Sequence, residues 1–214
     1  MAHDKTAVRK ILDKVKAEGR TSLTAPEGSS SATPSESRYR RKAWRRSAAE
    51  AAKLATAMGF PVVLKIVSPE ILHKTEAGGV LVGVKSADDV AKGYDTIIAN
   101  AKKYNAKANL LGVQVQQMLT GGQEVIIGAV TDQSFGKLVA FGLGGILVEV
   151  LKDITFRLAP ATRDDALSML DGVQAAEILK GVRGADPVDR EALANVIVGV
   201  SQLISSFQRS PRWT

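Results

Sequence analysis

The chain has 214 residues and a 45% hydrophobic content, which fits one domain of ordinary size or two small lobes that share a cleft. It contains no cysteine, so disulfides, thiolate nucleophiles and cysteine metal sites are excluded. No apolar run approaches the roughly 20 residues of a membrane-spanning helix, and the charged N-terminus lacks the apolar segment of a secretory signal. We therefore expect a cytoplasmic protein.

The net charge of +7 is local. Residues 29–47 and 208–214 together hold eight basic residues and one acid, Glu36, so the rest of the chain is neutral. A basic domain often binds nucleic acid. Because the charge here belongs to two short stretches and not to the patterned body, nucleic-acid binding is the weaker of the possible functions.

The first 47 residues divide into two parts. Residues 4–18 have the spacing of a short amphipathic helix. Residues 20–47 are rich in Ser, Thr and Pro and then in Arg, a composition that predicts a disordered basic arm. Two alternatives stay open: a phosphate-binding arm in which Tyr39 and Trp44 stack on bases, and coding sequence read in a shifted frame.

The body of the chain alternates helices and strands from Ala48 onward. Helices are predicted at 48–58, 86–104, 163–170, 174–180 and 187–207, and strands at 62–67, 79–84, 112–119, 123–131 and 137–141. Residues 145–158 are also strand-like, on both sides of Lys152 and Asp153. The succession of neighbouring strands, with helices laid over one side, predicts an α+β fold and not a doubly wound parallel sheet.

Lys65 interrupts the apolar strand 62–67. A lysine in such a position is costly unless its ammonium has a partner or reaches water. It lies either on an edge strand and points to solvent, or in a cleft where it binds phosphate oxygens.

The segment that follows, His73-Lys74-Thr75-Glu76-Ala77-Gly78-Gly79, ends on paired glycines before a strand. Such glycines let backbone amides approach an anion, and the lysine and threonine add donors. Taken alone, the glycines are typical of a simple turn and His73 of a loop residue without a role. His3 is the only other histidine, so imidazole chemistry in the patterned body would fall to His73.

Further polar groups follow the strand that begins at residue 112. That strand ends in the segment Gln114-Val-Gln116-Gln117-Met118, and Glu124 opens the next one. Amide and carboxylate groups at the end of an apolar strand suit an adenine edge and ribose hydroxyls. A glycine turn at 141–145 is followed by three charged residues that either act in a site or face water: Glu149, Asp153 and Arg157.

Together these motifs resemble the ATP-grasp part of ADP-forming acyl-CoA synthetases, a group that includes acetate–CoA ligase (ADP-forming) and is related to the succinyl-CoA synthetase beta subunit. The resemblance covers residues 48–207 and rests on Gly59–Pro69, His73–Val80, Gly122–Gly136 and Phe141–Pro160. It implies a two-lobed ATP-grasp fold that binds ATP or ADP with Mg²⁺.

The resemblance also implies roles for single residues. Lys65 and Lys74 would contact phosphate, Gly78 and Gly79 would close over it, Gln116, Gln117 and Met118 would lie at the adenine hinge, and Glu124 near the ribose. His73 would take a phosphoryl group from a phosphohistidine on a partner domain and pass it to ADP. The CoA-binding and ligase domains would be supplied by another chain.

Two stretches depart from the family. The family continues beyond helix 187–207 into Glu-x-Asp-Leu-Asn-Pro, whose Asp and Asn ligate Mg²⁺, whereas residues 208–214 differ here and leave Glu149 as a weak substitute ligand. The chain is therefore expected to divide into a helix at 1–19, an aberrant segment at 20–47, the domain at 48–207 and an aberrant tail. Both aberrant stretches can be reread with a one-base shift as family-like sequence, a hypothesis that DNA read in all frames would test. The alternatives to a working enzyme part are an inactive, marginally stable nucleotide-binding remnant and a basic-arm nucleic-acid binder.

Overall fold

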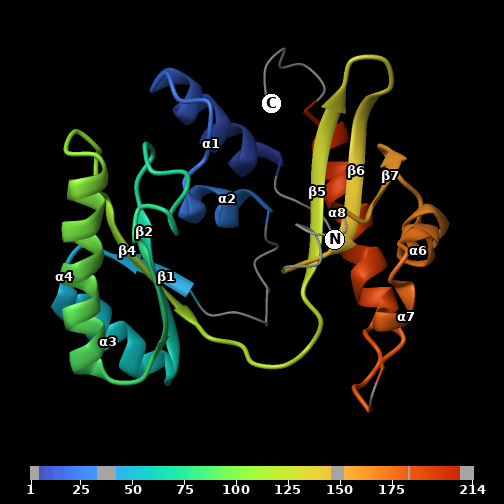
Figure 1. Ribbon diagram of the computed structural model, residues 1–214. Helices are drawn as coiled ribbons and strands as arrows, with labels where there is room; N and C mark the ends of the chain where they lie inside the picture. Colours follow the sequence, from blue (N-terminus) through green and yellow to red (C-terminus); the bar gives the residue numbers. More distant parts are fainter. Residues whose placement is uncertain (1–4, 33–41, 146–151, 183, 208–214) are drawn as a thin grey trace. The chain divides into compact units, whose positions relative to one another are not determined.

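The computed structural model describes residues 5–32, 42–145, 152–182 and 184–207 (Figure 1). The chain forms two compact units, one of Ala7–Thr120 and the other of Gly121–Thr214 together with the first six residues. Each unit contains an antiparallel sheet and helices. The predicted α+β class is confirmed.

The first unit is built on a four-stranded sheet of order β1-β4-β2-β3 in which every neighbouring pair is antiparallel. Its strands are β1 (Lys42–Arg45), β2 (Val62–Val67), β3 (Val80–Val84) and β4 (Gly112–Gln117). Its helices are α1 (Lys5–Ala17), α2 (Ala25–Ala32), α3 (Ala48–Met58) and α4 (Ala87–Tyr104).

Local signals set the ends of α3 and α4. The side chain of Ser47 accepts a hydrogen bond from the N–H of Glu50, and α3 ends at Gly59, whose φ of 84° a residue with a side chain rarely adopts. Ser86 caps α4 in the same way, through the N–H of Asp89. Both helices were predicted, at 48–58 and 86–104, and their positions are confirmed.

Strand alternation gives this sheet two different faces. Val62, Leu64 and Ile66 of β2 are buried together with Val113 and Val115 of β4 in the core under α3 and α4. Successive side chains of a strand point to opposite faces. The side chains of the intervening positions, Lys65 and Gln114 among them, therefore lie on the face away from that core.

The second unit has a three-stranded sheet of order β5-β6-β7. Its strands are β5 (Val125–Asp132), β6 (Gly136–Leu143) and β7 (Ile154–Leu158), and its helices are α6 (Arg163–Gly172), α7 (Ala176–Leu179) and α8 (Arg190–Ser205). Phe141 and Leu143 of β6 pack with Met169 and Leu170 of α6 and Ile197 of α8.

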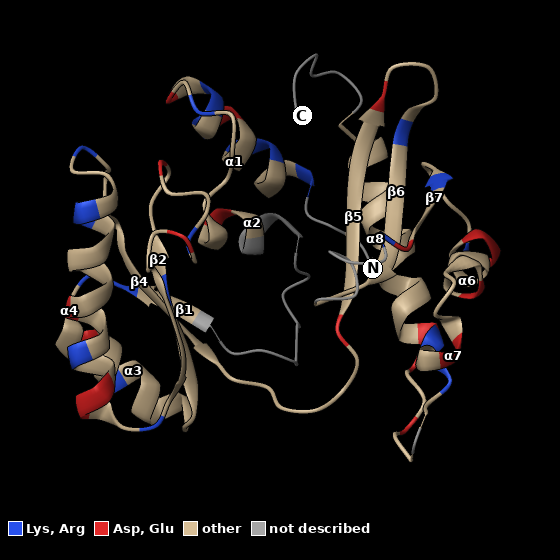
Figure 2. Ribbon diagram, in the orientation of Figure 1, with Lys and Arg blue, Asp and Glu red and all other residues tan. Residues whose placement is uncertain are grey.

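The other face of this sheet is apolar and open. Its exposed side chains, between 37% and 57% accessible, are Ile126, Val130, Ile154, Phe156 and Leu158. Charged residues of the described chain lie mainly on helices and turns, and the strands of both sheets are largely uncharged (Figure 2).

The structure differs from expectation within residues 20–47, because α2 and β1 lie there in place of a disordered arm. Arg20 anchors α2 with two hydrogen bonds, of 2.8 and 3.0 Å, to the carboxylate of Glu27, which also accepts from the N–H and hydroxyl of Thr24. These contacts, led by the Arg20 hydrogen bonds, lower the pKa of Glu27 to about 2.

β1 pairs with β4 over four residues, from Lys42 opposite Gln116 to Arg45 opposite Val113. Such a ladder is made by backbone groups that any residue except proline supplies, and it covers the edge that β4 would otherwise expose. The basic composition therefore did not prevent a strand within residues 20–47.

Three other expectations fall partly outside the described residues. Of the strand-like stretch 145–158, residues Ile154–Leu158 form β7, and residues 146–151 are not described. Tyr39 and the tail at 208–214 are likewise outside the description, so their interpretation stays a prediction. In the portion of the chain that is described, no helix has the length and apolar character to cross a membrane.

Candidate nucleotide site

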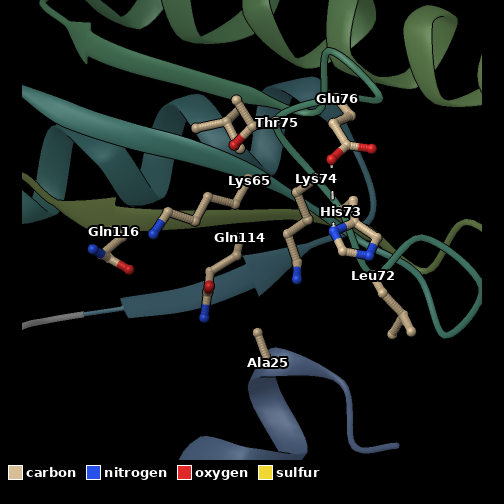
Figure 3. A pocket seen from close by; sticks show the side chains of 10 residues that line it. Ala25, Lys65, Leu72, His73, Lys74, Thr75, Glu76, Gln114 and Gln116 are labelled. Atoms are coloured by element: carbon tan, nitrogen blue, oxygen red, sulfur yellow. Dashed lines mark ion pairs between the residues drawn. The ribbon is translucent and has the colours of Figure 1, made fainter. Parts of the chain in front are cut away.

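A cavity of about 580 Å³ opens on the polar face of the first sheet. Figure 3 shows the side chains that line it. They come from the strands β2 and β4, from the loop that precedes β3 and the first residue of β3, and from α2, where Ala25 faces the strands. Six of them carry the chemistry: Lys65, His73, Lys74, Thr75, Gln114 and Gln116.

The sheet register brings the strand residues together. Lys65 of β2 is directly opposite Gln114 of β4, and Gln116 is opposite Val63. Directly opposed residues project from the same face of a sheet. β2 lies between β4 and β3, so Lys65 is not on an edge strand, and its side chain is partly buried in the cavity. The edge-strand interpretation of Lys65 is therefore wrong.

The loop between β2 and β3 places His73 and Lys74 at the cavity. It is held by its own backbone: the N–H of Ala77 donates to the carbonyl of His73, that of Gly78 to Thr75 at 3.0 Å, and that of Gly79 to Lys74 at 2.8 Å. The carbonyl of Gly79 then accepts from the N–H of Ile66, which ties the loop to β2.

The structure explains the glycines at positions 78 and 79 differently from the prediction. Gly78 has a φ of 59°, and a Cβ on Gly79 would lie 2.5 Å from Cγ2 of Ile66. Glycine is thus required for backbone conformation at one position and for close packing at the other. Because both N–H groups already donate within the loop, this geometry does not support the predicted approach of these amides to phosphate.

His73 is exposed, with 73% of its side chain accessible. Its Nδ1 lies 3.8 Å from Oε1 of Glu76, one turn further along the loop, as the dashed line in Figure 3 marks. An exposed imidazole with one nitrogen oriented toward a carboxylate leaves the other nitrogen open to solvent and to a reacting group.

The remaining predicted residues are not all brought to the cavity. Gln116 lines it, whereas Gln117 is opposite Val62 and belongs to the other face of the sheet. The N–H of Met118 donates to the carbonyl of Pro61 at 3.2 Å. Glu124 is exposed in the second unit, where its carbonyl accepts from the N–H of Gly144 at 2.7 Å.

Two of the later charged residues have structural partners. The buried carboxylate of Asp153 accepts hydrogen bonds from the N–H groups of Gln174 and Ala175, which directly precede α7. Arg157 donates to the hydroxyl of Ser168 on α6 at 2.9 Å. These contacts explain both charges without a ligand.

Two residues near the cavity had no settled role in the sequence analysis. Gln114 is only 4% exposed although it is polar, and the signal for it was present, since Gln114 and Gln116 alternate with valines in one strand. Trp44 is opposite Gln114 on β1, and the guanidinium of Arg46 lies 5.3 Å from the centre of its ring. The tryptophan therefore stacks with an arginine that follows it closely in the chain.

The described residues do not form a site for a divalent cation on their own. Among residues 5–32, 42–145, 152–182 and 184–207, no three His, Cys, Asp or Glu side chains come together. Mg²⁺ prefers several oxygen ligands in octahedral geometry, and Glu76 is the one carboxylate among the residues that line the described cavity. Glu149 lies outside the described residues.

Comparison with known proteins decides the family. The sequence profile of the ATP-grasp domain matches residues 14–209, which is most of the chain. The chain belongs to the ATP-grasp family. Its similarity extends to ADP-forming acyl-CoA ligases, as predicted.

Three relatives show which part of such ligases the ATP-grasp domain corresponds to. The present chain is 39% identical to the acetate–CoA ligase [ADP-forming] II subunit beta of Pyrococcus furiosus, over 93% of this chain and 84% of that one. It is 49% identical to the corresponding I subunit beta, over 72% of this chain and 66% of that one. The 4-hydroxybutyrate–CoA ligase [ADP-forming] of Nitrosopumilus maritimus is 42% identical over 96% of this chain, which spans 29% of that protein.

Solved structures agree. The acetyl-coenzyme A synthetase 1 of Ca. Korarchaeum cryptofilum, in complex with coenzyme A and Ca-AMPCP, superposes with a TM-score of 0.84 at 40% identity, over 92% of this chain and 86% of that one. Another structure of that protein, with Mg-AMPPCP and a phosphohistidine segment that points towards the nucleotide binding site, gives 0.76 at 37% identity over 92% and 84%. The ATP-grasp fold predicted from the motifs is confirmed.

Proposed function

We propose that this ATP-grasp domain binds ADP or ATP in the cavity of its first unit and transfers a phosphoryl group for an ADP-forming acyl-CoA ligase. The complete reaction would be acyl-CoA + ADP + phosphate ⇌ acid + CoA + ATP. The CoA-binding and ligase domains would be partners on another chain, as the naming of two relatives as beta subunits supports.

The observation that carries the proposal is the position of Lys65. Lys65 is on an internal strand, opposite the buried Gln114, and its side chain lies on the polar face of the first sheet. Lys74 reaches the same cavity from the loop between β2 and β3. Two ammonium groups at a partly enclosed polar surface match the charge and the oxygen acceptors of a nucleotide polyphosphate.

His73 fits the transfer step because its imidazole is exposed at the same cavity. One nitrogen of the neutral ring would attack the phosphorus of a phosphohistidine on the partner domain. The N–P bond of the partner breaks as that of His73 forms, and the partner imidazole leaves neutral after it takes up the proton that His73 loses. An oxygen of the β-phosphate of ADP then attacks the same phosphorus, the N–P bond of His73 breaks, and ATP forms. The ring of His73 takes up a proton from solvent and is restored as neutral imidazole.

Mg²⁺ enters only with the nucleotide in this proposal. When bound, it would neutralise phosphate charge. The described residues are assigned no part in holding Mg²⁺, and the steps above are assigned to Lys65, Lys74 and His73.

The test is the affinity for ATP and for adenosine, measured by calorimetry with Lys65→Met and, as a control, Lys53→Met. Lys53 is exposed on α3, which covers the other face of the same sheet. Loss of a charged hydrogen bond to phosphate should weaken ATP binding by about 1.5–3 kcal/mol in Lys65→Met and leave adenosine almost unchanged. Equal losses for the two ligands, or an equal effect of Lys53→Met, would show that Lys65 has no phosphate contact.

A further inference from the structure

Gln114 stands out among the buried polar residues of the first unit. It is 4% exposed and lies in the middle of the sheet, on β4 between β1 and β2. A carboxamide has two N–H donors and an oxygen that accepts two hydrogen bonds. In the described parts of the chain, the structure gives the side chain of Gln114 no hydrogen-bond partner, whereas every fully enclosed side-chain nitrogen or oxygen has one.

These two facts together locate the Gln114 amide. Since no fully enclosed polar atom of the described residues lacks a partner, the nitrogen and oxygen of Gln114 must reach the cavity that the residue lines. Figure 3 shows the side chain projecting from β4 into the space that Lys65 and Lys74 also enter. An amide that reaches a cavity is hydrated in the free protein, and a ligand with oxygen acceptors can replace that water and accept from the amide N–H group.

We infer that Gln114 is a phosphate-binding residue of the nucleotide site, in which its amide N–H group donates to the same polyphosphate that Lys65 binds. This inference rests on the proposed function. The register favours phosphate over the base, because Gln114 is directly opposite Lys65, whereas Gln116 lies two residues further along β4, about 7 Å away. Gln116 is thus the carboxamide that is placed to meet the sugar or the base.

This role predicts that removal of the Gln114 amide does not lower the stability of the free chain. Methionine has nearly the length of glutamine and no hydrogen-bonding amide. Gln114→Met therefore removes from the free protein an amide that bonds no described protein group, and it removes a donor from the complex. The melting temperature of the free chain should stay unchanged or rise by up to about 4 °C. A glutamine that supported the fold would give a fall.

The experiment measures the melting temperature of the 214-residue chain without nucleotide, and its affinity for ATP and for adenosine by calorimetry. The control is Gln202→Met, at an exposed glutamine of α8 in the second unit. We expect Gln114→Met to weaken ATP binding about tenfold, to leave adenosine binding unchanged and not to lower the melting temperature of the free chain. Gln202→Met should not alter ATP binding.

The outcomes separate the two proposals. A lower melting temperature of the free Gln114→Met chain, an unchanged affinity for ATP, or equal losses for ATP and adenosine would overturn the role of Gln114, and the last would assign it to the base. If Lys65→Met weakens ATP binding in the same assay, the nucleotide site itself still stands. A wild-type chain that binds neither ligand would overturn both.

Discussion

Replacing Gly79 with alanine tests whether close packing against Ile66 holds the loop between β2 and β3 in place. Gly79 is buried, and its backbone donates to the carbonyl of Lys74 and accepts from the N–H of Ile66. A Cβ there would lie 2.5 Å from Cγ2 of Ile66 and 3.0 Å from the oxygen of Lys74. Ordinary carbon–carbon contacts are about 3.5–4.0 Å, so the methyl group must displace either β2 or the loop by about 1 Å.

Overpacking of this kind costs about 1–3 kcal/mol of the free energy of unfolding. The loop offers the softer response, so Lys74 should move and ATP affinity should fall as well. Urea unfolding followed by circular dichroism measures the first effect, and calorimetry with ATP the second. The control is Gly128→Ala, because Gly128 also lies in a sheet but a Cβ added there would meet open space, with no neighbouring atom within 4 Å.

A double mutant identifies the cause. Ile66→Ala removes the clashing Cγ2, so it should cost less in the Gly79→Ala background than in the wild type, with a coupling of about 1 kcal/mol or more. Additive costs for the two substitutions, or a Gly79→Ala chain as stable as the wild type, would refute the packing account of this glycine.

Three further outcomes are expected. His73→Ala should abolish phosphoryl transfer from a phosphorylated partner and leave nucleotide affinity nearly intact, and an acid-labile phosphoryl group retained on the variant would contradict the role of His73. The pKa of Glu27 is lowered from 4.5 to about 2, so the stability it contributes is complete above pH 4.5 and is lost as pH falls from there toward 2. After allowance for partial exposure this amounts to about 1–2 kcal/mol, and Arg20→Met should remove it, so an equally acid-sensitive variant would argue against the pair. Calorimetry with Mg²⁺ and with EDTA should show a smaller gain in ATP affinity than in the relatives from Pyrococcus furiosus, since the described residues hold no carboxylate cluster, and a strong gain would place the ligands in residues not described.

Much of the fold was accessible from sequence because its signals are local. Ser47 and Ser86 accept from N–H groups three residues ahead, and Gly59 allows the backbone turn that ends α3. Such contacts are closed within one turn of helix and need no knowledge of distant residues. The β-branched run of β2 and its single lysine were visible for the same reason, since alternation along a strand is a property of the strand itself.

The sequence alone determined the family, the order of helices and strands in the body, and the anomalous positions of Lys65 and His73. Only the tertiary structure decided that β1 forms from a basic segment, that Gln114 stands opposite Lys65, that Gly79 is held by Ile66, and that Asp153 serves the start of α7. Each of these depends on which strand or helix lies alongside, and the register between segments far apart in the chain is set by the packing of the whole unit. A pattern along the chain shows which residues are unusual for their places, whereas the neighbours that give them a role come from the fold.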